Sequence, residues 1–285
     1  MRLLAFSDIH NNLVAVRKLR VFEKNSFDAI VVAGDIGNES AADFFRILAT
    51  FKCPVLYVYG NWDDELGYKA SFGDHCFLMQ SNVITIDNIS FTGFSGCPTN
   101  WGKNPFYRKC ARQARLDENE VLKLNRESIR KVLKKGKIDP RKCVIISHER
   151  LRRLSEEVPG ALLHLFGHLH TFSDQTFKTT RYVNVAALDR PVSARPRGKA
   201  KWGKEDCRNF NAGNYTVIEI GSQDMKIRCV NLAHDYPDWI PLDDRRYNGI
   251  AWIPEEARWT KASDPPLRQY EMSRSPRTAK SHAAA

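Results

Sequence analysis

Three short apolar runs open the chain, and each of them ends in a small residue followed by a polar one. The runs cover residues 2–6, 28–33 and 54–59, and apolar positions near helical spacing lie between them at 13–24 and 40–50. Short continuous apolar runs predict buried strands, and a 3.6-residue spacing predicts amphipathic helices. Strand, helix, strand, helix and strand in this order predict a βαβαβ unit with a parallel sheet.

The polar residues that end these three strands are Asp8, Asp35 and Asn61. In open α/β sheets, ligands bind in the crevice outside the carboxyl ends of the strands. We therefore expect the three side chains to lie close together at one edge of the sheet, although they are far apart along the chain.

More strands are predicted in the rest of the chain. Two apolar runs, 143–147 and 161–166, also end in polar residues, which are His148 and the run Gly167-His168-Leu169-His170. The remaining elements are a hairpin of 83–86 and 89–94 around Asp87-Asn88, a loop at 95–108, a basic helix at 117–135, and strands at 181–186, 214–220 and 225–231.

The domain organisation follows from this pattern. Residues 1–234 are predicted to form one domain with a basic helical insert at about 100–140, and residues 235–285 a C-terminal extension. The extension carries Trp-Ile-Pro triplets that begin at Trp239 and Trp252, and we expect these to dock on the domain. Disorder is predicted from about residue 263, where the chain becomes polar and basic.

Composition narrows the class of protein. The apolar run that ends at Phe6 is too short for a signal peptide, and no run approaches the roughly 20 apolar residues of a membrane helix. The chain has 7 cysteines and no Cys-x-x-Cys pair, which argues against a disulfide framework and against a thiolate zinc site. We therefore expect a cytoplasmic protein that does not interact with membranes.

The chain carries a formal net charge of +11, and nearly all of the excess lies in one segment. Between Trp101 and Lys142 we count fourteen Lys or Arg against five Asp or Glu. A basic patch attracts phosphates, so the segment 103–142 is a candidate surface for nucleic acid or another polyanion. The alternative is a solvated helix face, which is the commoner role of such a run.

The residues at the strand ends share one kind of chemistry, although each short motif is unspecific by itself. They are carboxylates, an amide and imidazoles, which suit hard to borderline divalent metals. Asp8 and His10 are two residues apart, as are His168 and His170, so we expect each pair to point to the same side. Imidazoles and carboxylates that converge without partners would be costly, and metal ions would satisfy them.

These motifs, in this order, resemble the five motifs of the calcineurin-like metallophosphoesterases. The resemblance spans about residues 3–190 and implies an α/β fold, a two-sheet β-sandwich flanked by helices in four layers, α/β/β/α. The matching motifs are Ser7-Asp8-Ile9-His10, Gly34-Asp35, Gly60-Asn61-x-Asp63, Ser147-His148 and Gly167-His168-Leu169-His170.

The resemblance also implies a centre of two divalent metal ions, with manganese, iron and zinc all open as their identity. One ion would be held by Asp8, His10, Asp35 and His170, and the other by Asp35, Asn61, His148 and His168, with Asp35 bridging. Metals about 3.5–4 Å apart would bind a phosphate ester and bridge a hydroxide that attacks phosphorus. Catalytic roles are then implied for Asp8, Asp35, Asn61, Asp63 and His148, and substrate binding for Asn61, Trp62 and His148.

Trp62 departs from the family pattern, because many members carry a His at this position that is thought to protonate the leaving group or bind phosphate. Indole has only an N–H donor. Three interpretations stay open. The substrate could need little protonation, as diesters or pyrophosphates do; His75 or His164 could supply the proton; or the site could bind phosphate and turn over slowly. Trp62 itself could stack on a base or sugar or form a wall of the pocket.

The segment from Gly93 to Thr99 and the position of Asn184 are similar to the Icc-like group of predicted phosphoesterases, although a simple turn and a polar strand end explain them equally well. The sequence as a whole favours a phosphoesterase, with a diester such as a nucleotide or nucleic acid as the leading substrate. The alternatives are a phosphomonoesterase, a metal-binding scaffold with little activity, and a nucleic-acid-binding protein whose metals are secondary.

Overall fold

Both faces of the central strands are buried, so the chain must build more than one hydrophobic core. In the computed structural model, Leu3 and Ala5 of strand β1 (Arg2–Phe6) enter one core, whereas Leu4 and Phe6 enter another. This alternation follows from the two-residue period of a strand. The structure describes residues 1–67, 70–97, 117–185, 187–189, 213–222, 224–231, 246–247, 250–253 and 258–261.

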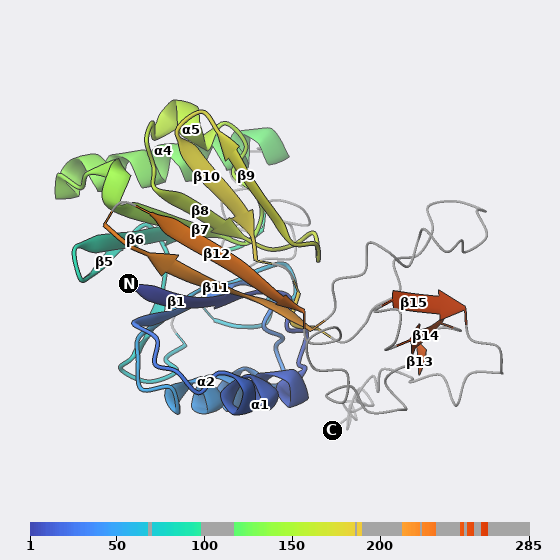
Figure 1. The fold of residues 1–285 in the computed structure, drawn as a ribbon. Helices are drawn as coiled ribbons and strands as arrows, with labels where there is room; N and C mark the ends of the chain where they lie inside the picture. The colour runs from blue at the N-terminus through green and yellow to red at the C-terminus, as the bar shows by residue number, and fades with distance from the viewer. Residues whose placement is uncertain are drawn as a thin grey trace, which may run out of the picture.

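Two six-stranded sheets pack against each other (Figure 1). The first sheet has the order β12-β11-β1-β2-β3-β4. Strands β1 to β4 are parallel to one another, β11 is antiparallel to β1, and β12 is antiparallel to β11. Its further strands are β2 (Ala29–Ala33), β3 (Val55–Val58), β4 (Cys76–Leu78), β11 (Asn214–Ile220) and β12 (Met225–Asn231).

The second sheet has the order β5-β6-β7-β8-β10-β9, with β6, β7, β8 and β10 parallel and both edge strands antiparallel to their neighbours. Its strands are β5 (Val83–Ile86), β6 (Ile89–Phe94), β7 (Cys143–Ser147), β8 (Leu163–Phe166), β9 (Ser173–Phe177) and β10 (Thr180–Asn184).

Helices cover the outer face of each sheet, so the domain has the four predicted layers (Figure 1). Helices α1 (Leu13–Phe22) and α2 (Ala41–Ala49) lie on the first sheet, and α4 (Glu118–Gly136) and α5 (Leu154–Glu157) on the second. Three buried apolar clusters correspond to the three interfaces between these layers. The predicted two-sheet sandwich is therefore confirmed.

The strands and long helices predicted from apolar runs are present within one or two residues of their expected bounds. The predicted hairpin is present too, with Asp87 and Asn88 in left-handed conformations at φ 45° and 66°. Between residues 1 and 231, the described elements that the sequence pattern did not indicate are β4, β9, α5 and a 3₁₀ turn at Pro140–Lys142. They are short, and β9 is a mostly exposed polar edge strand, so none carries a hydrophobic period.

Helix α4 begins at a capping box, in which Asp117 accepts the backbone N–H of Glu120 and the Glu120 side chain accepts that of Asp117. Its buried stripe includes Leu122, whereas Leu124 is exposed. The predicted basic segment ends at Lys142, directly before β7, so its last residues lie at the opposite end of β7 from His148. Five residues of strand span about 16 Å.

The C-terminal extension contributes a small antiparallel sheet in the order β13-β14-β15, formed by β13 (Arg246–Tyr247), β14 (Ile250–Ile253) and β15 (Arg258–Lys261). The first Trp-Ile-Pro triplet, residues 98–108 of the predicted loop, and the disorder predicted from about residue 263 lie outside the described residues. The boundary near residue 234 and the docking of the extension stay predictions. None of the helices described is long and apolar enough to cross a bilayer.

His164 shows how completely the interior is hydrogen-bonded. Its ring lies on the α5 side of β8, where Nε2 accepts the backbone N–H of Leu151 at 3.1 Å and Nδ1–H donates to the carbonyl of Ile145 at 3.2 Å. Burial lowers the pKa of His164 to about 3. The imidazole is therefore a neutral structural group with a fixed tautomer.

We predict that His164 makes the fold sensitive to acid. The unfolded chain takes up a proton on His164 below about pH 6.5, whereas the folded chain does not. The stability that depends on the neutral ring is therefore fully present above pH 6.5 and is lost as the pH falls toward 3. In urea unfolding at pH 7, 6, 5 and 4, His164→Gln should be less stable than the wild type at pH 7. The gap should narrow by up to about 3 kcal/mol at pH 4. Parallel stability curves for the two proteins would contradict this.

Candidate metal centre

The candidate ligands lie on loops that leave the strands, and most of these residues have an unusual backbone. Asp8, His10, Asp35, His168 and His170 have positive φ angles of 50°, 48°, 53°, 71° and 52°. Non-glycine residues rarely adopt this region, and such strain concentrates at functional sites. The two-residue spacing of Asp8 and His10 therefore acts through left-handed backbone and not through the period of a strand, and their side chains still lie on the same side, with His10 Nε2 4.0 Å from Asp8 Oδ1.

Backbone hydrogen bonds tie these loops to one another. The Asp8 N–H donates to the carbonyl of Gly34 at 3.0 Å, and the His10 N–H donates to that of Asp35 at 3.0 Å. Across the sandwich, the N–H of His168 donates to Asp8 Oδ2 at 3.1 Å. The sequence pattern suggested one sheet edge, but the ligands come from two sheets that face each other: β1, β2 and β3 position four of them, and β7 and β8 position three.

One group of side chains surrounds the carboxylate of Asp8. His170 Nε2 lies 3.3 Å from Asp8 Oδ1, while His10 Nε2 lies 4.0 Å from the same oxygen and 3.6 Å from Asp35 Oδ2. Asp8 Oδ1 and His10 Nε2 are both buried and have no hydrogen-bond partner among the described residues. A buried acceptor beside a buried ring nitrogen fits a cation between them.

The second group shares Asp35 with the first. His148 Nε2 lies 3.4 Å from Asp35 Oδ2, and Asn61 Oδ1 lies 3.2 Å from both His148 Nε2 and His168 Nδ1. Carboxylate, amide and imidazole atoms thus converge on a second point beside the first. The structure brings all seven predicted ligands together in two adjoining groups, and the assignment of metals to them stays a prediction.

Electrostatics within the cluster favour a positive charge beside Asp35. Burial lowers the pKa of His148, but the carboxylates of Asp35 and Asp8 and the carbonyl of Ala33 outweigh it and raise the pKa to about 10. Burial alone would raise the pKa of Asp35, but the charges of His148 and His10 outweigh burial, so the pKa lies below its ordinary value. The surroundings of Asp35 thus favour a positive charge beside its buried carboxylate, which a bound metal ion would supply.

Asp63 lies behind the ligands. Its two carboxylate oxygens accept the backbone N–H groups of Gly37 at 2.8 Å and Gly60 at 2.7 Å. Burial, together with the charge of Asp35, raises the pKa of Asp63 to about 7. These contacts hold the loop after β2 against the loop after β3. They favour a positioning role, and the catalytic role predicted for Asp63 stays untested.

Trp62 borders the cluster with both its backbone and its ring. The backbone N–H donates to Asp35 Oδ1 at 2.8 Å, and the indole meets the His10 ring edge to face, with centroids 4.5 Å apart. The side chain is 41% exposed. The indole therefore covers His10 from the solvent side, where it is available as a wall beside a substrate.

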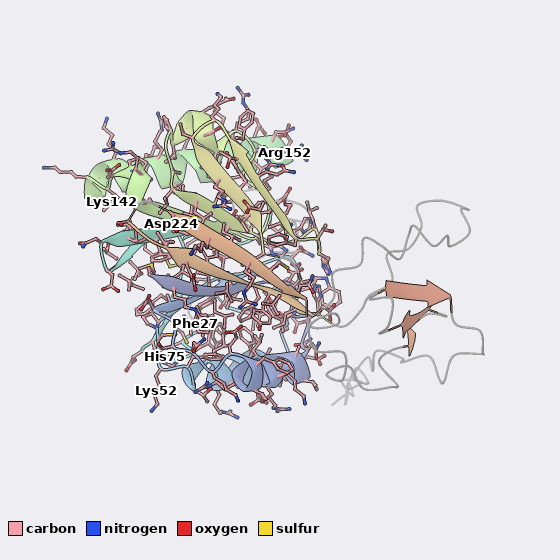
Figure 2. The ribbon with its side chains drawn as sticks, viewed as in Figure 1. Phe27, Lys52, His75, Lys142, Arg152 and Asp224 are labelled. Carbon is pink, nitrogen blue, oxygen red and sulfur yellow. The ribbon has the colours of Figure 1, made fainter. Side chains whose placement is uncertain are left out.

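The two other histidines considered as proton donors lie elsewhere. His164 is the structural group on the α5 side of β8. The carbonyl of His75 accepts the N–H of Val55 at the start of β3, which places it at the amino ends of the parallel strands. Figure 2 labels His75 near Phe27 and Lys52, which precede β2 and β3. Neither residue is placed to protonate a leaving group at the carboxyl ends.

Cys97 and Glu149 also lie at the cluster, although sequence reasoning did not single them out. The Cys97 thiol is buried, lies 3.9 Å from His168 Nδ1 and donates to Glu149 Oε2 at 3.4 Å. Cys97 follows β6 closely, as His148 follows β7, and the two strands are parallel neighbours. A prediction that β6 and β7 pair in parallel would therefore have placed Cys97 beside His148. Asn184, noted from the Icc-like resemblance, donates to the carbonyl of Gly167 at 3.0 Å and steadies the last motif.

The sequence matches the family model described as "Calcineurin-like phosphoesterase superfamily domain" over residues 1–200. The chain therefore belongs to the calcineurin-like phosphoesterase superfamily, whose members are phosphoesterase hydrolases that typically bind divalent metals. No curated protein matches the sequence.

The chain is similar to several solved structures at low sequence identity. The protein TT1561 of Thermus thermophilus is 15% identical with a TM-score of 0.50, and the alignment covers 80% of this chain and 97% of that one. A predicted phosphoesterase from Streptococcus pneumoniae is 14% identical with a TM-score of 0.41, covering 82% and 90%. A novel archaeal phosphodiesterase is 11% identical with a TM-score of 0.41, covering 81% and 100%. The Thermus protein supports the fold, and no conclusion about activity follows from these likenesses.

We predict that Gly34→Ala disrupts the centre. A Cβ at position 34 would lie 2.5 Å from His148 Nδ1, and the glycine has a φ of +89° that other residues rarely adopt. The His148 ring would have to move, so zinc affinity, measured by competition with a chromogenic chelator, should fall at least tenfold, or about 1.4 kcal/mol. The matched control is Gly67→Ala, because no atom lies within 4 Å of that Cβ. Equal affinity in the two variants would contradict the prediction.

Proposed function

We propose that the protein hydrolyses phosphate esters with the help of two divalent metal ions, and that it prefers diesters to monoesters. The observation that carries the proposal is the convergence of seven oxygen and nitrogen donors around the buried residues Asp8, Asp35 and His148, in which Asp8 Oδ1 and His10 Nε2 lack a hydrogen-bond partner among the described residues. Membership of a phosphoesterase superfamily supports the reaction class.

The donor set fits manganese, iron or zinc, because it mixes carboxylate and amide oxygens with imidazoles. When bound, two such ions would polarise the phosphate and make a water molecule acidic enough to serve as nucleophile near neutral pH. Asp35 lies between the two groups and would be shared by both ions. Asn61 and His148 face the same point and would orient the phosphate.

The proposed preference for diesters rests on Trp62, because many members of the family carry a histidine at this position that could protonate a leaving group. At position 62 the chain offers an indole, which cannot supply a proton to a departing alkoxide. His164 is held neutral inside the fold, and His75 lies at the other end of the strands. Substrates with a good leaving group, such as aryl diesters or pyrophosphates, depend less on such an acid. In a nucleotide diester the leaving oxygen is a sugar alkoxide, and the metal ions would have to stabilise its charge in place of a protein acid.

The alternatives differ in what they predict for purified protein. A phosphomonoesterase would prefer aryl monoesters, and a binding module would take up metal without turnover. Nucleic acid binding through the segment 103–142 would be salt-dependent. A reducing compartment such as the cytoplasm suits the five cysteines that the structure describes, which form no disulfide with one another.

We predict that removing a ligand from either group abolishes hydrolysis. Asp8→Asn and His148→Gln should each lower kcat/KM for an aryl phosphodiester about 10³-fold or more, because several kcal/mol of metal-dependent stabilisation would be lost. Metal content by elemental analysis and thermal unfolding of the same samples separate loss of metal from loss of fold. The matched control is His75→Gln, which removes a histidine from the opposite end of the strands and should keep full activity. Activity that survives in both ligand variants would sink the proposal.

We predict that Trp62→His shifts the preference of the enzyme toward monoesters. An imidazole at this position can donate a proton to a leaving group, whereas the indole cannot. The ratio of kcat/KM for an alkyl phosphomonoester to that for an aryl phosphodiester should rise about tenfold or more. Trp62→Phe is the matched control, since it keeps an aromatic wall without an acid. A similar ratio in the two variants would mean that position 62 does not set the preference.

A further inference from the structure

A cavity of about 580 Å³ opens beside the candidate metal centre and reaches His168, one of the predicted ligands. Three arginines line it, Arg150, Arg152 and Arg153, and aromatic side chains complete it, Phe177 and Tyr182. Its size is that of a small-molecule site. None of the residues that line it comes from residues 117–142, the described part of the basic segment that carried the expectation of polyanion binding.

The arginines belong to the same segment as a ligand of the centre. His148 follows β7, and four of the next five residues, 149–153, line the cavity. The Ser147 hydroxyl donates to the carbonyl of Glu149 at 2.7 Å, and the buried Leu151 donates its N–H to His164. The structural histidine therefore fixes the loop that presents the arginines, so their position relative to the centre is set before any ligand binds.

The three guanidinium groups differ in how far they are already engaged. Arg150 lies over the ring of Tyr182, 4.8 Å from its centroid. Arg153 Nε pairs with Glu156 at 2.8 Å. The exposed Arg152 guanidinium forms no ion pair or side-chain hydrogen bond with the described residues. Arg152 is thus the cation that is available to an incoming anion, and Glu149, the remaining acid of the cavity, already accepts the Cys97 thiol.

The other side of the cavity is apolar and open to solvent. Leu169 is 62% exposed and Phe177 is 51% exposed, which is unusual for such large apolar side chains. Exposed apolar surface that borders fixed cations suits a ligand that combines a flat ring with an anionic group. A guanidinium is well matched to a phosphate because its planar donors can bind two oxygens at once.

We infer that this cavity binds the part of the substrate beyond the scissile bond, and that the substrate is a nucleotide-type diester with a second phosphate group held by Arg152. The inference rests on the proposed phosphodiesterase function, which would act at the adjoining centre. The base would lie against Phe177 and Leu169, and the second phosphate would reach Arg152. Arg152 is then a residue that determines specificity and has no part in the bond-breaking step.

The test compares two thymidine dinucleotides that share the same scissile phosphate, one with and one without a 5′-terminal phosphate. The wild type should show a higher kcat/KM for the phosphorylated dinucleotide. In Arg152→Ala the ratio of the two kcat/KM values should fall about tenfold, through KM, and Arg152→Lys should restore part of it. Lys18→Ala is the matched control, because it removes one exposed cation from α1, which covers the first sheet and not the second, and it should leave the ratio unchanged.

A second measurement does not depend on turnover. Binding of the phosphorylated dinucleotide to the metal-loaded protein, followed by calorimetry, should weaken about tenfold in Arg152→Ala and stay the same in Lys18→Ala. If the wild type cleaves no diester but shows this difference in binding, the inference stands and the proposed function fails. If the protein cleaves both dinucleotides and Arg152→Ala changes neither the ratio nor the binding, the function stands and the inference is overturned.

Discussion

The carboxylate of Asp35 lies where the two sheets meet, and it is only 2% exposed. Imidazoles from both sheets face it, His10 at 3.6 Å and His148 at 3.4 Å, and Trp62 donates a backbone N–H to it. A buried charge of this kind is tolerated only when it is compensated. The carboxyl ends of β2 and β7 therefore have to stay in line, so that polar groups from both sheets surround the buried carboxylate of Asp35.

Much of the fold could be predicted because its central strands are buried on both faces. Such strands are continuous apolar runs, and their bounds are visible in the sequence. The edge strand β9 could not be predicted, because four of its five residues are exposed and its one apolar residue, Phe177, is too little to form a pattern. Strand β4, with three partly buried residues, depends on pairing with β3 and has no pattern of its own.

The ligand types and their gathering could be predicted, since each follows a strand whose end the sequence marks. Their detailed arrangement could not, because it depends on left-handed turns and on contacts between distant loops. Asp63 illustrates this: its carboxylate holds two glycine N–H groups, and only the folded loops bring them together. Arg152 was missed for a different reason, since its neighbourhood with His168 and Phe177 is created by the pairing of β7, β8, β10 and β9.

The alternating burial of β1 has a consequence for how this family of sequences can change in length. Leu3 and Ala5 serve the core between the sheets, while Leu4 and Phe6 serve the core under α1 and α2. Inserting or deleting one residue within Arg2–Phe6 would move the side chains beyond the change to the opposite face of the strand, and therefore into the wrong core. The loop that follows β1 would then leave the strand with its side chains on the opposite face. Length variation among homologues should therefore be confined to the connections, and the spacing from the start of β1 to Asp8 should stay constant.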